Sequence, residues 1–185
     1  MGEIEDAIER ANRESFTRQP PKTLKGQIGY LIRQLGSAKA VAREIGVTAD
    51  SVNRYRRGAR KHARPDVAAK IDDAVRARWQ PQVRKRRQKQ AATTGGITVE
   101  TRARFGYTAP VGTTDDGRFR RLTVHLPPAY AQRLFDARNT GAGDQQMRQI
   151  IAEGLKEIYF QDGGSRALGL SDVTLNDIDY LDLDY

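Results

Sequence analysis

The chain has 185 residues, 38% of them hydrophobic, and a formal net charge of +9 with a pI near 10.0. It contains no cysteine and only two histidines, which excludes a disulfide framework, a thiolate metal site and a His-only zinc site. No apolar run approaches the roughly 18 residues of a membrane span, and the acidic start is not typical of a signal peptide, so we expect a cytoplasmic protein.

The charge is distributed unevenly along the chain. The first 90 residues hold 22 Lys and Arg against 10 Asp and Glu, whereas residues 161–185 hold 1 against 6. Basic surfaces attract polyanions, of which nucleic acid is the commonest. This pattern predicts a nucleic-acid-binding N-terminal half and an acidic tail over residues 162–185.

Helical periodicity dominates residues 1–79. Apolar side chains recur every three to four positions from Glu3 to Phe16, from Leu24 to Leu35 and from Pro65 to Trp79. Paired prolines end the first of these segments and Gly36 ends the second. We therefore expect one helical domain over residues 1–79.

Two shorter helices inside this domain predict a helix-turn-helix over residues 37–58. The helices span Ala38 to Ile45 and Ala49 to Arg57, with Gly46 as the turn glycine and Thr48 as the N-cap of the second. A plain helical hairpin fits the same spacing, but the basic second helix favours DNA binding. The candidate DNA contacts of this region are Ser51, Asn53, Arg54, Arg56, Arg57, Arg60 and Lys61.

Residues 80–96 have almost no apolar side chains and predict either a charged linker or the tail of a helix. They contain four consecutive basic residues, Arg84, Lys85, Arg86 and Arg87. This block is a candidate for contacts with DNA phosphates, although a solvated linker or a sequence that mimics a nuclear localisation signal would look the same.

The pattern then changes to that of strands and helices over residues 97–161. Apolar and polar side chains alternate from Ile97 to Tyr107 and again from Arg121 to Leu126, which predicts a hairpin joined by a polar turn. Two helices follow, one opened by Pro128 and one capped by Asp144. The fold class is therefore α+β: a helical bundle, a basic linker, a β-hairpin with two helices, and an acidic tail.

The acidic tail alternates Asp with Ile, Tyr and Leu, which is typical of a peptide that is disordered alone or that adds to a sheet or a partner. One strand followed by two helices is also the element order of ribbon-helix-helix proteins. If the two strands pair within one chain, that match is only partial. No constellation of side chains predicts a hydrolytic or metal centre.

The sequence resembles the telomere-protecting terminal proteins (Tpg) of linear Streptomyces chromosomes and plasmids over nearly its full length. The resemblance rests on the segments SAKAVAREIGVTADSVNRYRRGARKHARPD, RWQPQVRKRRQ, ITVETRARFGYTAPVGTTDDGRFRRLT and NDIDYLDLDY. Such proteins replace the missing RNA primer at a recessed telomere end and become covalently joined to the 5′ end of the DNA. The resemblance implies that this chain is a primer and a substrate, not an enzyme.

The resemblance also implies the site and the partners. The linking hydroxyl is expected at Thr114, with Thr113 as the alternative, joined to the first nucleotide from dCTP. The chain itself is expected to bind no cofactor, and a DNA polymerase is expected to supply Mg²⁺. Other expected partners are telomeric DNA, as 3′ overhang and duplex, and a telomere-associated protein.

Several roles stay open at this point. Asp115 and Asp116 either orient the threonine or hold a metal, or simply form an ordinary turn. The hairpin and the acidic tail are candidates for protein contacts or self-association, and the tail is alternatively a mask over the basic surface. A transcriptional or partition regulator that binds DNA non-covalently is the alternative function, and a self-acting nucleotidyltransferase is a third.

Overall fold

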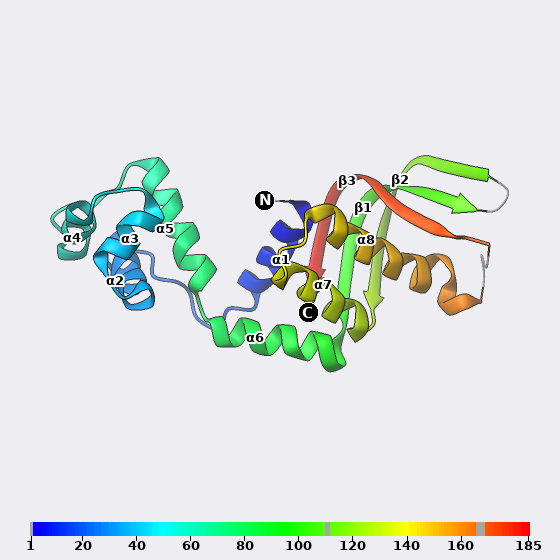
Figure 1. Ribbon diagram of the computed structural model, residues 1–185, viewed down its shortest axis with the longest axis horizontal. Coiled ribbons are helices and arrows are strands. Elements are labelled where there is room, and N and C mark those ends of the chain that lie inside the picture. Colours follow the sequence, from blue (N-terminus) through cyan, green and yellow to red (C-terminus); the bar gives the residue numbers. More distant parts are fainter. Residues whose placement is uncertain (1, 110–111, 166–168) are drawn as a thin grey trace. The chain divides into compact units, whose positions relative to one another are not determined.

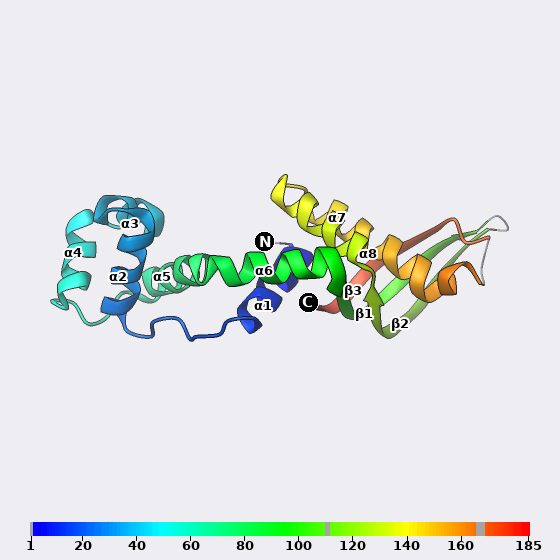
Figure 2. The same cartoon turned by 90° about the horizontal axis from the view of Figure 1, so that it is seen from below.

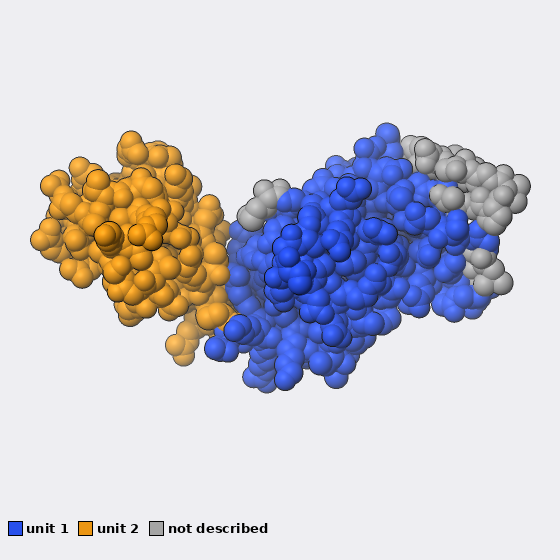
Figure 3. Space-filling view, in the orientation of Figure 1, with its two compact units in different colours: residues 1–15, 82–185 blue, residues 16–81 orange. Residues whose placement is uncertain are grey.

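The computed structural model describes residues 2–109, 112–165 and 169–185, and for residues 108, 109 and 112–118 it describes the backbone alone. These residues form an α+β structure with eight α-helices and a three-stranded antiparallel sheet (Figure 1). The chain divides into two compact units, Phe16–Pro81 and the combination of Met1–Ser15 with Gln82–Tyr185 (Figure 3). No helix among the described residues is both long enough and apolar enough to cross a membrane.

Four helices build the unit of residues 16–81. They are α2 (Leu24–Leu35), α3 (Ala38–Ile45), α4 (Ala49–Arg57) and α5 (Pro65–Arg78). Side-chain oxygens of Thr23, Ser37 and Thr48 accept hydrogen bonds from the first turns of α2, α3 and α4. The bounds predicted for these three helices are confirmed, because strong local caps specify where each helix begins.

The helices of this unit pack around a single apolar core. Helix α2 contacts α3, α4 and α5, and its Ile28 and Leu31 are fully buried. The predicted seam of α5 is buried at Val67, Ile71 and Val75. Trp79 ends that helix, packs edge-on against Tyr30 at 4.9 Å between ring centroids, and donates its indole N–H to the Arg18 carbonyl at 2.8 Å.

The other unit contains the sheet, whose strand order is β2-β1-β3. The strands are β1 (Ile97–Ala109), β2 (Gly112–Leu126) and β3 (Asp172–Asp184), and both outer strands run antiparallel to β1. Because β1 takes β2 as a partner within the chain, the ribbon is an intramolecular hairpin. The ribbon-helix-helix match is therefore only partial.

Three helices cover one face of the sheet (Figures 1 and 2). They are α1 (Glu3–Glu14), α7 (Pro128–Asn139) and α8 (Asp144–Leu155). The sequence assigned α1 to the N-terminal helical domain, and this assignment is wrong. Ile4 and Ile8 of α1 are fully buried in the core of the sheet-containing unit, because their apolar face matches that distant layer.

Asp144 supports this placement of α1. The sequence predicted Asp144 as the cap of α8, but the N-cap of that helix is Gly143, without a side-chain cap. One Asp144 oxygen instead accepts a hydrogen bond of 2.8 Å from the backbone N–H of Ile4. A carboxylate at a helix N-terminus satisfies a free N–H and complements the helix dipole, so Asp144 stabilises the start of α1.

The segment predicted as a basic linker is helical. Helix α6 (Pro81–Gln90) continues into a short π-helical turn, η1 (Ala91–Gly95), that ends at Gly96. Gly96 has φ +70°, and a β-carbon there would lie 2.3 Å from the Leu126 carbonyl oxygen, so the approach to the sheet requires glycine. The linker interpretation is corrected to an ordered helix that leads directly into β1.

The acidic C-terminal segment is also ordered over most of its length. Its residues form β3, in which Val173, Leu175, Leu181 and Leu183 are buried and the aspartates point outward. The sequence predicts either disorder or addition to a sheet for this segment, and the structure shows a strand of the sheet. Pairing with β1 satisfies the backbone groups of this strand along one edge.

Candidate nucleic-acid interface

Helix α4 presents a basic face opposite a buried one. Val52 and Tyr55 pack into the core, whereas Arg54, Arg56 and Arg57 are exposed. The helix is reached from α3 through Gly46, which has φ +70° and an exposed position. In Figure 1 the helix lies at the periphery of its unit, with α2, α3 and α5 to one side of it.

Two of the candidate contacts on α4 have local partners. The Arg54 guanidinium forms an ion pair of 2.8 Å with Asp50, one helical turn earlier. The Ser51 hydroxyl lies 3.0 Å from the hydroxyl of the N-cap Thr48. Both partners are on the surface, where a phosphate can compete for Arg54 at little cost, since exposed ion pairs contribute less than about 1 kcal/mol.

The basic surface continues beyond α4. Gly58 ends the helix with φ +77°, and the exposed Arg60 and Lys61 follow it directly. Asn53 is half-buried on the helix itself. The structure therefore brings together on one helix and its C-terminal turn all seven residues that the sequence selected from this region.

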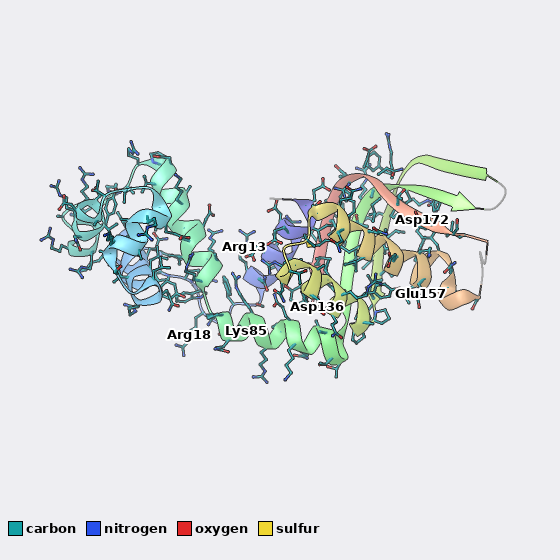
Figure 4. The ribbon with its side chains drawn as sticks, viewed as in Figure 1. Arg13, Arg18, Lys85, Asp136, Glu157 and Asp172 are labelled. Atoms are coloured by element: carbon teal, nitrogen blue, oxygen red, sulfur yellow. The ribbon has the colours of Figure 1, made fainter. Side chains whose placement is uncertain are left out.

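The basic block of α6 divides into two groups. Lys85, Arg86 and Arg87 are exposed, and Figure 4 labels Lys85 on this helix. The Arg84 side chain is only 11% exposed and forms an ion pair of 3.4 Å with Glu9 of α1. Arg84 as a DNA contact is therefore corrected, because its guanidinium is buried against α1 and holds α6 in place.

A polar network around Arg84 fixes α6 against its unit. Asn12 of α1 is fully buried, and its side-chain oxygen accepts hydrogen bonds from the Gln88 amide at 3.3 Å and the Tyr185 hydroxyl at 2.9 Å. Arg138 of α7 bonds to Glu5 at 2.8 Å and also to Glu9. Burial alone would lower the pKa of the Arg138 guanidinium, but the bonds to these two carboxylates outweigh burial and raise it.

The predicted priming residues lie in β2. The backbone of Thr114 pairs with Tyr107 and that of Thr113 with Thr108, both in β1. The polar turn predicted between Tyr107 and Arg121 is therefore corrected, because strand β2 begins at Gly112. The side chains of Thr113, Thr114, Asp115 and Asp116 lie outside the described part of the structure.

The hairpin is irregular next to these residues. The register of β1 and β2 shifts between Arg104, which opposes Phe119, and Gly106, which opposes Asp115. Three residues of β2 thus face one residue of β1, which is a bulge. Bulges bend a strand and redirect its side chains, and they often occur beside functional sites.

The face of the sheet that the helices leave open carries groups that the sequence analysis missed. Phe119 is 38% exposed, and the guanidinium carbons of Arg102 and Arg104 lie 4.9 and 4.8 Å from its ring centroid. The sequence predicts a second strand that begins at Arg121, so Phe119 lies outside the predicted strand. The signal that would have found it is alternation, because Phe119 and Arg121 are two positions apart and share a face.

Electrostatic pairing extends across this open face. Asp177 and Asp179 of β3 form ion pairs with Arg104 at 3.3 Å and Arg102 at 2.5 Å. Also on β1, Glu100 accepts hydrogen bonds from Arg121 of β2 at 2.6 Å and from the Tyr180 hydroxyl of β3 at 3.1 Å, and these bonds lower the pKa of its carboxyl. The face thus runs from acidic on β3 to basic and aromatic on β2.

Among the described residues, no group of three or more His, Cys, Asp or Glu side chains is placed to hold a metal ion. Comparison with known proteins adds no assignment, since no family model, no curated protein and no solved structure matches the chain.

Proposed function

We propose that this chain is a DNA-binding terminal protein that primes the patching of linear DNA ends. In this proposal α3, the Gly46 turn and α4 form a helix-turn-helix, and α4 contacts DNA. The observation that supports DNA binding is that α4 buries Val52 and Tyr55 on one face and exposes its arginines on the other. Arginines on an exposed helix are suited to phosphates and to guanine edges in the major groove.

The exposed part of α6 is a second proposed DNA contact and belongs to the other unit. A helix carries the exposed Lys85, Arg86 and Arg87, and a helix loses less conformational freedom on binding than a flexible linker does. Each phosphate that these cations neutralise releases counterions, so the affinity falls as the salt concentration rises.

The priming hydroxyl is proposed at Thr114, with Thr113 as the alternative. Its oxygen attacks the α-phosphorus of dCTP and forms a phosphodiester, and the bond to the departing pyrophosphate breaks. The hydroxyl proton passes to solvent or to a base of the polymerase, whose Mg²⁺ ions polarise the reacting phosphate. The 3′-hydroxyl of the attached nucleotide is then the primer end.

The position of Thr113 and Thr114 supports a priming role, but the two residues lie in a strand instead of a flexible loop. Both lie in the part of the β1–β2 hairpin beyond the register shift, where β1 also pairs with β3. A hairpin extension can enter a polymerase site, although it is a paired strand and not a free loop.

The proposal is tested by incubating the full chain with labelled dCTP, a DNA polymerase and a telomeric template. Nuclease-resistant label on the protein is expected, with its loss in Thr114→Ala and its retention in Thr113→Ala and Thr114→Ser. The opposite result for the two alanine variants moves the site by one residue.

Two other results contradict the proposal. Absence of label from the unsubstituted protein would favour the alternative, a helix-turn-helix regulator that binds DNA without a covalent bond. Label that forms without polymerase would identify the chain as a nucleotidyltransferase acting on itself.

A further inference from the structure

The open face of the sheet contains an exposed aromatic ring set among cations. Phe119 is the one large apolar side chain exposed on this face within the described residues, since the other exposed one, Tyr159, belongs to the segment after α8. A contact surface for a protein core would require a contiguous apolar patch. An isolated ring between guanidinium groups fits a different ligand.

The two arginines beside the ring are fixed in place. Each is held by an aspartate of β3 on one side and lies over Phe119 on the other. Arg102 and Arg104 both come from β1, and 38% of Phe119 stays exposed beside them. This exposed part of the ring can stack with a planar group.

We propose that this surface, formed by Phe119, Arg102, Arg104 and Arg121, binds single-stranded nucleic acid by stacking a base on Phe119. Bases of a duplex are stacked inside the helix and cannot reach a ring on a sheet, whereas every unpaired base offers a flat face. Arg121, whose side chain is 72% exposed, pairs with Glu100 at the surface, where a phosphate can compete for it at little cost.

The position of Phe119 places the nucleic acid over the β1–β2 side of the sheet. On the β3 side, the outward carboxylates of Asp177, Asp179 and Asp182 are each paired with an arginine, so those arginines attract a phosphate less. The stacking site does not depend on the priming role of Thr113 or Thr114, because binding requires neither polymerase nor dCTP.

The test measures the affinity of the full chain for a labelled single-stranded oligonucleotide and for a hairpin duplex at one ionic strength. Phe119→Ala is expected to weaken single-strand binding roughly 5- to 150-fold, since stacking on an aromatic side chain contributes about 1–3 kcal/mol per base. Duplex binding, which is proposed to depend on α4, stays unchanged. Thr123→Ala, an exposed position on the same face, is the matched control.

Further variants separate stacking from other roles of the ring. Phe119→Trp should retain single-strand affinity and Phe119→Leu should lose it, because only an aromatic ring stacks. Since Phe119 is exposed, these variants should unfold at nearly the same temperature as the unsubstituted protein.

Three results overturn the inference. They are unchanged single-strand affinity in Phe119→Ala, an equal loss of duplex affinity, and full affinity in Phe119→Leu. None of these results bears on labelling at Thr114, so the two proposals fail separately.

Discussion

Tyr185 is partly buried and packs against the core of the sheet-containing unit. Its ring packs edge-on against Phe135 at 5.0 Å between centroids, and its hydroxyl donates to the buried Asn12 side chain. Burial of the phenol raises the pKa of Tyr185 to about 12. The folded protein therefore keeps this phenol neutral above pH 10, which is about the pKa of an ordinary tyrosine.

This shift predicts a loss of stability at alkaline pH. The contribution of the neutral phenol is fully present below about pH 10 and is lost as the pH rises toward 12, and a shift of this size corresponds to about 3 kcal/mol. Tyr185→Phe removes the ionisable group but also a hydrogen bond, which costs about 1 kcal/mol at neutral pH.

The free energies of unfolding of the two proteins, measured in urea across this pH range, should therefore cross. The unsubstituted protein is the more stable at neutral pH, and Tyr185→Phe is the more stable near pH 12. A difference that stays constant with pH would mean that Tyr185 is not buried as a neutral phenol.

Among the elements, α6 combines a structural side with an exposed basic side. Arg84 and Gln88 are a turn apart and face α1, whereas Lys85 and Arg86 point to other sides of the helix and are exposed. Adjacent residues with the same charge thus have different roles, which a count of basic residues cannot distinguish.

Two variants of α6 should separate these roles. Arg84→Met is expected to lower the free energy of unfolding by about 1–3 kcal/mol, because it removes one of the two arginine partners of the largely buried Glu9. Lys85→Met should change stability by less than about 0.5 kcal/mol while it weakens DNA binding and reduces the salt dependence of the affinity.

Urea unfolding and DNA titrations at several salt concentrations provide the measurements. If Arg84→Met left stability unchanged but weakened DNA binding, Arg84 would be a DNA contact and would not hold α6 in place.

At the scale of the molecule, the two units have different requirements for folding. The core of residues 16–81 is complete within that segment, since its twelve buried residues all come from α2 to α5. The core of the other unit joins α1 to the C-terminal half of the chain and includes Ile4, Ala7 and Ile8.

A fragment of residues 16–81 should therefore be helical and unfold cooperatively, as judged by circular dichroism. A fragment of residues 82–185 should not fold, because loss of two buried isoleucines alone costs about 4–10 kcal/mol, comparable to the stability of a domain. Adding a peptide of residues 1–15 should restore its structure. Cooperative unfolding of residues 82–185 without that peptide would contradict the assignment of α1.

The sequence by itself determined the local structure of this protein. Caps at Thr23, Ser37 and Thr48 and a left-handed glycine at Gly46 specified the helices of one unit, and alternation specified the inner face of β1. These signals are contained within a few residues of each other, so no distant contact is needed to interpret them. The DNA-contacting face proposed for α4 was accessible to sequence analysis for the same reason.

Only the tertiary structure decided which distant segments pack together. Nothing near Asp144 in the sequence reveals that it caps α1, and the charge pattern of α6 does not reveal that Arg84 faces Glu9. The pairing of β3 with β1 likewise depends on backbone partners about 80 residues apart. The setting of Phe119 arises in the same way, because the arginines and aspartates around its ring meet only when three separate strands form one sheet.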